Sequence, residues 1–120
     1  MNKQIIKETS ETPLITMDFD NGTFEISGRS FANNANVFYQ PIIDSCKDYS
    51  FNPASSTIMI FKLEYFNSIA QKYFAELIKI LKDLPSFSVR WYYESDDEDL
   101  LSLGKKYEKL FNLRMEFIEY

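Results

Sequence analysis

The chain contains no histidine, and it has only one cysteine and three glycines among its 120 residues. The missing histidine removes the commonest general base and metal ligand of enzymes. The single Cys46 excludes an intrachain disulfide and a cysteine cage for a metal. Three scattered glycines, Gly22, Gly28 and Gly104, cannot form a phosphate-cradling loop. We therefore expect no cofactor, no metal and no catalytic residues.

Basic clusters and long apolar runs are also lacking. The net charge is -5 and the isoelectric point is about 4.7, which argues against nucleic acid and anionic lipid as partners. No apolar run reaches the roughly 18 residues of a membrane span, and the N-terminal residues lack the apolar region of a signal peptide. These absences predict a cytoplasmic protein that binds neither nucleic acid nor membrane.

Aromatic side chains, in contrast, are abundant. The chain has 11 Phe, 8 Tyr and 1 Trp, and hydrophobic residues make up 45% of it, so a sizeable core can form. The length predicts a single domain over residues 1–120. We interpret most of the aromatic rings as core packing, and Cys46, which lies in a helical pattern, as a small buried hydrophobe.

Apolar periodicity and turn signals predict the element order β-β-β-α-β-α-β-α-β. Asn21-Gly22 between two β-rich runs indicates a hairpin. Pro41 indicates either one kinked helix or a helix that starts near Gln40, and we expect the kinked helix. Strands are expected at residues 4–7, 14–19, 23–27, 57–63, 87–93 and 115–120, and helices at residues 35–50, 69–84 and 100–111.

The later strands alternate with helices, which is typical of parallel crossovers. The predicted fold class is therefore α/β, with a mixed, mostly parallel sheet, an N-terminal antiparallel hairpin and three helices. The nearly continuous apolar run at residues 57–63 predicts a central strand that is covered on both faces.

Asn67 and Ser68 occupy the joint between that central strand and the most regular helix pattern of the chain. Ser68-Ile69-Ala70-Gln71 fits a capping box, in which Ser68 would accept a hydrogen bond from the helix backbone. A phosphate group is also well placed at this position, because free N–H groups and the helix dipole favour an anion. Both interpretations of Ser68 are compatible with the residue pattern.

Two neighbouring features also have alternative interpretations. Tyr65 and Phe66 precede the joint, and either one ring is exposed as a binding surface or both rings tuck over the sheet edge. The acidic run at residues 94–99 is either a metal or general-acid site or a helix start. Ser95 and Glu98 have capping-box spacing, and carboxylates complement the dipole of a first helical turn, so we favour the helix start.

Several ordered motifs along the chain resemble the SiaC family of bacterial regulatory phosphoproteins. The central motif is Leu63-Glu64-Tyr65-Phe66-Asn67-Ser68. The others are Thr12-Pro13 before a strand ending in Asp18, Ile26-Ser27-Gly28-Arg29-Ser30, Asn34-Ala35 before Phe38-Tyr39-Gln40-Pro41, Trp91-Tyr92-Tyr93-Glu94 with Asp96-Asp97-Glu98-Asp99, and Gly104 with Tyr107.

This resemblance implies a STAS-like fold, similar to that of anti-sigma factor antagonists, and a phosphorylation switch. It implies that a serine/threonine protein kinase phosphorylates Ser68 and that a PP2C-type phosphatase reverses the reaction. It also implies that the unmodified form binds and activates a GGDEF diguanylate cyclase, which raises cyclic di-GMP and controls biofilm formation. The expected partner-binding residues are Tyr65, Phe66, Asn67, Ser68 and Ile69.

The chain departs from the family pattern at the joint. The family typically has Thr followed by small polar residues, whereas here Ser68 is followed by Ile69-Ala70. Anti-sigma factor antagonists proper usually carry Asp-Ser-Ser-Gly at this position, and an antagonist of that type with a different protein partner is the alternative function. A small enzyme that uses the acidic run at residues 94–99 with a divalent metal is a third hypothesis.

Overall fold

The computed structural model describes residues 2–120 and has the predicted element order. Three helices and a six-stranded sheet make up the fold. The elements are β1 (Lys3–Ile6), β2 (Leu14–Asp18), β3 (Thr23–Ser30), α1 (Ala35–Ser50), β4 (Thr57–Phe66), α2 (Ser68–Leu81), β5 (Phe87–Tyr93), α3 (Glu98–Leu110) and β6 (Glu116–Glu119).

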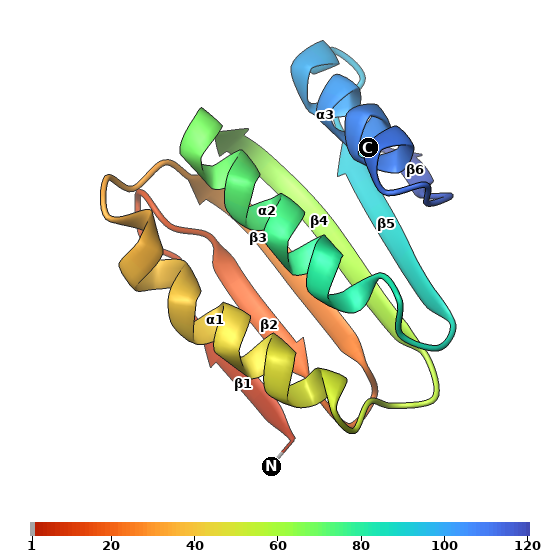
Figure 1. Cartoon of the computed structure of the whole chain (residues 1–120). Helices are drawn as coiled ribbons and strands as arrows, with labels where there is room; N and C mark the ends of the chain where they lie inside the picture. Colours follow the sequence, from red (N-terminus) through yellow and green to blue (C-terminus); the bar gives the residue numbers. More distant parts are fainter. Residues whose placement is uncertain (1) are drawn as a thin grey trace.

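The strands lie in the sheet in their sequence order, β1-β2-β3-β4-β5-β6. The first three strands pair antiparallel, and β3 to β6 pair parallel. All three helices lie on the same face of the sheet (Figure 1). Because successive parallel strands are added in one direction, crossovers of one hand place every helix on one side. The predicted mixed α/β fold class is confirmed.

The predicted hairpin between β2 and β3 is confirmed, and its turn is held by a side chain. The Asp18 carboxylate accepts hydrogen bonds from the Asn21 backbone N–H (3.2 Å) and from Asn21 Nδ2 (2.9 Å). These bonds lower the pKa of Asp18. Gly22 has a φ of +70°, and a Cβ there would collide with the carbonyl oxygen of Ser56. Only glycine satisfies both the backbone conformation and the close approach.

The environment of strand β4 differs from the prediction. Met59, Phe61 and Leu63 are buried beneath the helices, whereas Ile58 and Ile60 are only half-buried. The prediction that this strand is covered on both faces is therefore wrong. A continuous apolar run does not reveal on which side the helices will lie, and here they all share one side.

The face of the sheet away from the helices tolerates water because charged side chains are interspersed among its apolar ones. Lys62 Nζ lies 4.7 Å from the centroid of the Tyr92 ring on the adjacent strand. Arg90 Nε lies 3.4 Å from Glu116 Oε1 across the β5–β6 pair. Such exposed pairs contribute little to stability, but they keep this face hydrated.

Aromatic rings fill much of the core, as the composition predicts. Phe61 of β4 packs against Trp91 of β5 at 4.8 Å between ring centroids and against Phe74 of α2 at 5.7 Å. All three side chains have no exposed surface. Pairs of this geometry contribute roughly 0.5–1.5 kcal/mol beyond their buried area. This cluster holds β4, β5 and α2 together.

Helix boundaries agree with the prediction for α1 and differ by one to three residues for the other two: α2 spans residues 68–81 rather than 69–84, and α3 spans residues 98–110 rather than 100–111. Helix α1 has the predicted bounds and contains Pro41 in its interior. The last regular helical bond of α2 runs from the Lys82 N–H to the Ile78 carbonyl at 2.8 Å, whereas the Leu84 N–H bonds to the Leu81 carbonyl, only three residues back, at 3.0 Å. No helix within residues 2–120 is both long enough and apolar enough to cross a membrane.

Helix α3 approaches the sheet closely at Gly104. A Cβ at this position would lie 2.8 Å from Trp91 Nε1 and 2.8 Å from a ring carbon of Phe117. The Trp91 indole N–H in turn donates to the Leu100 carbonyl at 2.9 Å. The absence of a side chain at Gly104 therefore sets the depth at which α3 packs on β5 and β6.

Replacement of Gly104 by valine should lower the free energy of unfolding by about 2–3 kcal/mol, because the added atoms would overpack a site without free volume. Urea denaturation measures this loss. Ser102→Val, at an exposed position of the same helix, is the control and should stay within about 0.5 kcal/mol of the wild type. Equal stability of the two variants would contradict the packing argument.

Candidate functional site

The candidate site lies where β4 ends and α2 begins. Strand β4 extends three residues beyond its predicted end, so Tyr65 and Phe66 belong to the strand. Its neighbour β3 ends at the same level, with Ser30 paired to Phe66. The Asn67 backbone N–H then donates to the Ser30 carbonyl at 3.1 Å, and α2 starts at Ser68. The two strand ends therefore fix the first turn of α2.

Asn67, rather than Ser68, caps α2. The Asn67 side-chain oxygen accepts the Ala70 N–H at 2.9 Å, and the Asn67 backbone is extended, with φ -107° and ψ 179°. The prediction that Ser68 is the cap of a capping box is wrong. Asparagine and serine are equally good cap residues, so adjacent ones cannot be distinguished by sequence preference. Ser68 becomes the first helical residue, and its side chain is exposed.

The two aromatic residues before the joint have different environments. Tyr65 is 55% exposed, and its ring centroid lies 5.5 Å from that of Phe31. Phe66 is half-buried and packs on Phe74 at 6.5 Å between ring centroids. Ile69, in the first turn of α2, is 42% exposed. Of the two alternatives for the rings, the structure therefore has one exposed and one tucked in. Tyr65, Ser68 and Ile69 form the exposed part of the joint.

A buried hydrogen bond and a ring stack support the joint from below. The Ser30 and Tyr39 hydroxyls lie 2.7 Å apart, and both side chains are buried. The Tyr39 ring stacks on Tyr73 of α2 at 4.8 Å, with an angle of 9° between the ring planes. Burial raises the pKa of Tyr39, so its hydroxyl stays protonated. This arrangement connects the end of β3, α1 and α2.

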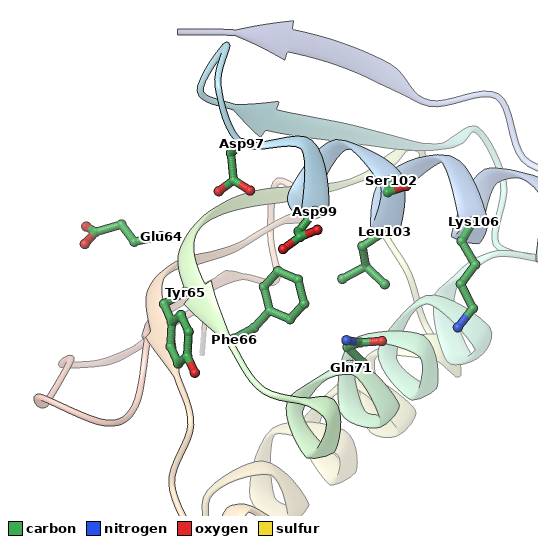
Figure 2. Close-up of a pocket in the computed structure, with 9 residues that line it drawn as sticks. All are labelled: Glu64, Tyr65, Phe66, Gln71, Asp97, Asp99, Ser102, Leu103 and Lys106. Carbon is green, nitrogen blue, oxygen red and sulfur yellow. The ribbon is translucent and has the colours of Figure 1, made fainter.

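An open hollow of about 540 Å³ lies beside the joint, between α2 and α3. Figure 2 shows Phe66 and Leu103 in its middle, Asp97 and Asp99 on one side and Lys106 on the other. The complete lining consists of Glu64, Tyr65, Phe66, Gln71, Asp97, Asp99, Ser102, Leu103 and Lys106. The hollow places the start of the acidic helix α3 next to the predicted partner-binding residues.

The acidic run at residues 94–99 begins helix α3. The Asp97 side chain accepts the Leu100 N–H at 3.0 Å and is the N-cap, whereas Glu98 and Asp99 occupy the first turn. The favoured interpretation as a helix start is confirmed, but the predicted capping role of Ser95 is wrong. Among residues 2–120, no three acidic or cysteine side chains converge in a way that could hold a metal ion.

Cys46 is buried in α1, as predicted. Burial raises the pKa of its thiol to about 12. The nucleophilic form of cysteine is the thiolate, so this residue is chemically inert in the folded protein.

Comparison with known proteins identifies the family. The model of one protein family, described as "SiaC family regulatory phosphoprotein", matches residues 6–120. The chain belongs to the SiaC family. A search of curated proteins found no match.

Solved structures of SiaC from Pseudomonas aeruginosa have the same fold. The crystal structure of apo-SiaC has 21% identity and a TM-score of 0.82, and covers 99% of this chain and 98% of that one. Another SiaC structure has 20% identity and a TM-score of 0.84 over 100% of both chains. A crystal structure of the diguanylate cyclase SiaD in complex with its activator SiaC gives a match with 20% identity and a TM-score of 0.88. This match covers 98% of this chain and 99% of that one.

The SiaC-like motifs found in the sequence converge in part on this site. Tyr65 to Ile69 form the joint, and Asp97 and Asp99 of the acidic motif lie across the hollow. The sequence did not identify Ser30 and Tyr39 as supports of the joint. They fall within SiaC-like segments at residues 26–30 and 38–41, but no local pattern relates the end of a strand to a helical residue nine positions further along the chain.

Asn67→Ala should lower the free energy of unfolding by about 1 kcal/mol, because it removes the cap of α2. Ser68→Ala should change it by less than about 0.5 kcal/mol. Urea denaturation of both variants distinguishes the two residues. A loss in Ser68→Ala as large as that in Asn67→Ala would contradict the assignment of the cap.

Cys46 should not react with a thiol reagent at pH 8 while the protein is folded. Burial raises the pKa of the thiol far above this pH, so the reactive thiolate is scarce, and the side chain is also shielded from the reagent. The urea-unfolded chain is the positive control and should react promptly. Prompt labelling of the native protein would contradict the inert assignment.

Proposed function

We propose that this chain is a non-enzymatic phospho-switch protein of bacterial signalling, with Ser68 as the phosphate acceptor. The observation that carries the proposal is that the helix cap and the phosphate acceptor are two different residues of the joint. Asn67 caps α2, and Ser68 is an exposed residue beside it. A kinase can therefore transfer a phosphoryl group from ATP to Ser68 Oγ without removing the hydrogen bond that caps the helix.

The first turn of α2 is also a favourable environment for the product. Phosphoserine carries about -1.5 to -2 charges at neutral pH. The first residues of a helix have N–H groups without helical partners and lie at the positive end of the helix dipole. Phosphorylation of Ser68 is therefore compatible with the native fold.

Membership of the SiaC family supports the assignment of partners. A serine/threonine protein kinase adds the phosphate, and a PP2C-type phosphatase removes it. The unmodified form binds and activates a GGDEF diguanylate cyclase and so controls cyclic di-GMP and biofilm formation. A relative with the same fold is described as the activator of a diguanylate cyclase, in a complex with that enzyme.

The proposed partner surface consists of Tyr65, Phe66, Asn67, Ser68 and Ile69. Tyr65 and Ile69 supply exposed apolar area on either side of Ser68, which suits a protein interface. Phe66 and Asn67 act mainly by holding the turn in place. A phosphate at Ser68 would have to lose its water in this interface, and the burial of an unpaired charge is strongly unfavourable. The phosphorylated form therefore releases the cyclase.

The partner for this test is the diguanylate cyclase encoded in the same genome. Ser68→Ala should bind it with the affinity of the wild type. Ser68→Asp should bind it about tenfold more weakly, which corresponds to a loss of about 1.4 kcal/mol in binding free energy. Isothermal titration calorimetry measures both affinities. Ser55→Asp adds the same charge in the exposed loop before β4, at the opposite end of the strand, and should leave the affinity unchanged. Equal affinities of Ser68→Ala and Ser68→Asp would contradict the proposed release mechanism.

Incubation with the partner kinase and ATP, followed by phosphopeptide mass spectrometry, should locate the phosphate on Ser68 and on no residue of Ser68→Ala. Phosphate on another residue would remove the central assignment. Recovery of an anti-sigma kinase, rather than a cyclase, in a pull-down from native cells would instead favour an anti-sigma factor antagonist.

A further inference from the structure

Helices α2 and α3 are separated by the open hollow, yet one partly buried hydrogen bond crosses from α3 to α2. The Tyr107 hydroxyl of α3 donates to the Gln71 backbone carbonyl of α2 at 2.6 Å. The Tyr107 side chain is buried. The two residues are 36 positions apart in the sequence, so the bond fixes the relative position of two helices that the chain connects only through β5.

The acceptor of this bond belongs to the turn that carries Ser68. Gln71 lies three residues after Ser68, which is one helical turn along the same side of α2. The Gln71 N–H donates to the Asn67 carbonyl at 3.3 Å, in the same turn as the side-chain cap. Gln71 is therefore held through its N–H by the joint and through its carbonyl by α3. A backbone carbonyl has two lone pairs and can accept both the Tyr107 bond and the helical bond from Ala75.

The donor is itself firmly placed. The Tyr107 ring contacts the Trp91 ring edge to face, at 5.9 Å between centroids. Trp91 is anchored to α3 through the Leu100 carbonyl, and Gly104 allows α3 to approach the same indole. Burial raises the pKa of Tyr107, so the hydroxyl remains a donor at any physiological pH.

We propose that Tyr107 is the positioning residue of the switch: its hydroxyl holds the turn that carries Ser68 at a fixed place relative to α3. This inference deepens the proposed function and rests on it. The kinase and the cyclase then meet Ser68 and Ile69 on a rigid turn rather than on a fraying helix end. Phosphorylation acts as a change of charge on this turn, without a change in the path of the backbone.

Tyr107→Phe removes only the hydroxyl and tests the proposal in the full chain. Tyr49→Phe is the matched control, because the buried Tyr49 hydroxyl also makes hydrogen bonds, to Thr57 Oγ1 (2.8 Å) and from the Ala54 N–H (3.1 Å), at the opposite end of β4. Urea denaturation first establishes that both variants fold and lose comparable stability. Amide hydrogen exchange then measures local opening of α2, and calorimetry with the cyclase measures partner affinity.

After correction for the global stability of each variant, the amides at residues 70–75 should exchange about fivefold faster in Tyr107→Phe than in Tyr49→Phe. The affinity for the cyclase should fall about fivefold in Tyr107→Phe and stay within about twofold of the wild type in Tyr49→Phe. A purely structural role of Tyr107 would lower global stability without this local effect.

Unchanged local exchange in Tyr107→Phe would overturn the inference, and so would faster exchange combined with wild-type affinity. Failure of the wild-type chain to bind the cyclase would count against the proposed function instead. In that case, the exchange measurement on the isolated protein still decides whether Tyr107 holds the Ser68 turn.

Discussion

Burial of the Phe61 ring against Trp91 and Phe74 determines where β4 lies, and the other features of the site depend on it. The three rings lock the central strand to β5 and to α2, so the strand end and the helix start have fixed positions. The end of β3 at the same level then receives the Asn67 N–H, which orients the first turn of α2. An exposed joint is in this way built on the most deeply buried part of the molecule.

Local sequence patterns predicted most of the fold because its elements have clear periodicities and turn signals. The Asn21-Gly22 hairpin, helix α1 with its internal Pro41 and strand β5 are examples in which propensity and tertiary packing agree. The environment of β4 was predicted incorrectly, because an apolar run reports hydrophobicity but not the side on which helices pack. That choice depends on the order of strands in the sheet, which is a global property of the chain.

The site was predicted less completely than the fold, for two physical reasons. Ser68 and Asn67 are both good cap residues, and only the extended backbone of Asn67 determines that its side chain reaches Ala70. The supporting hydroxyls act over long sequence separations, as the bond from Tyr107 to Gln71 illustrates. A pattern within one element contains no information on such a bond, although tyrosines that are buried usually find a partner.

The cap by Asn67 has a consequence for the abundance of the protein in the cell. Degradation of a folded protein often follows the population of its open form. The bond from the Ala70 N–H to Asn67 does not involve the Ser68 side chain, so the proposed phosphorylation of Ser68 would not remove it. The two forms of the proposed switch would then have similar lifetimes, and their proportion would report the balance of kinase and phosphatase rather than differences in turnover.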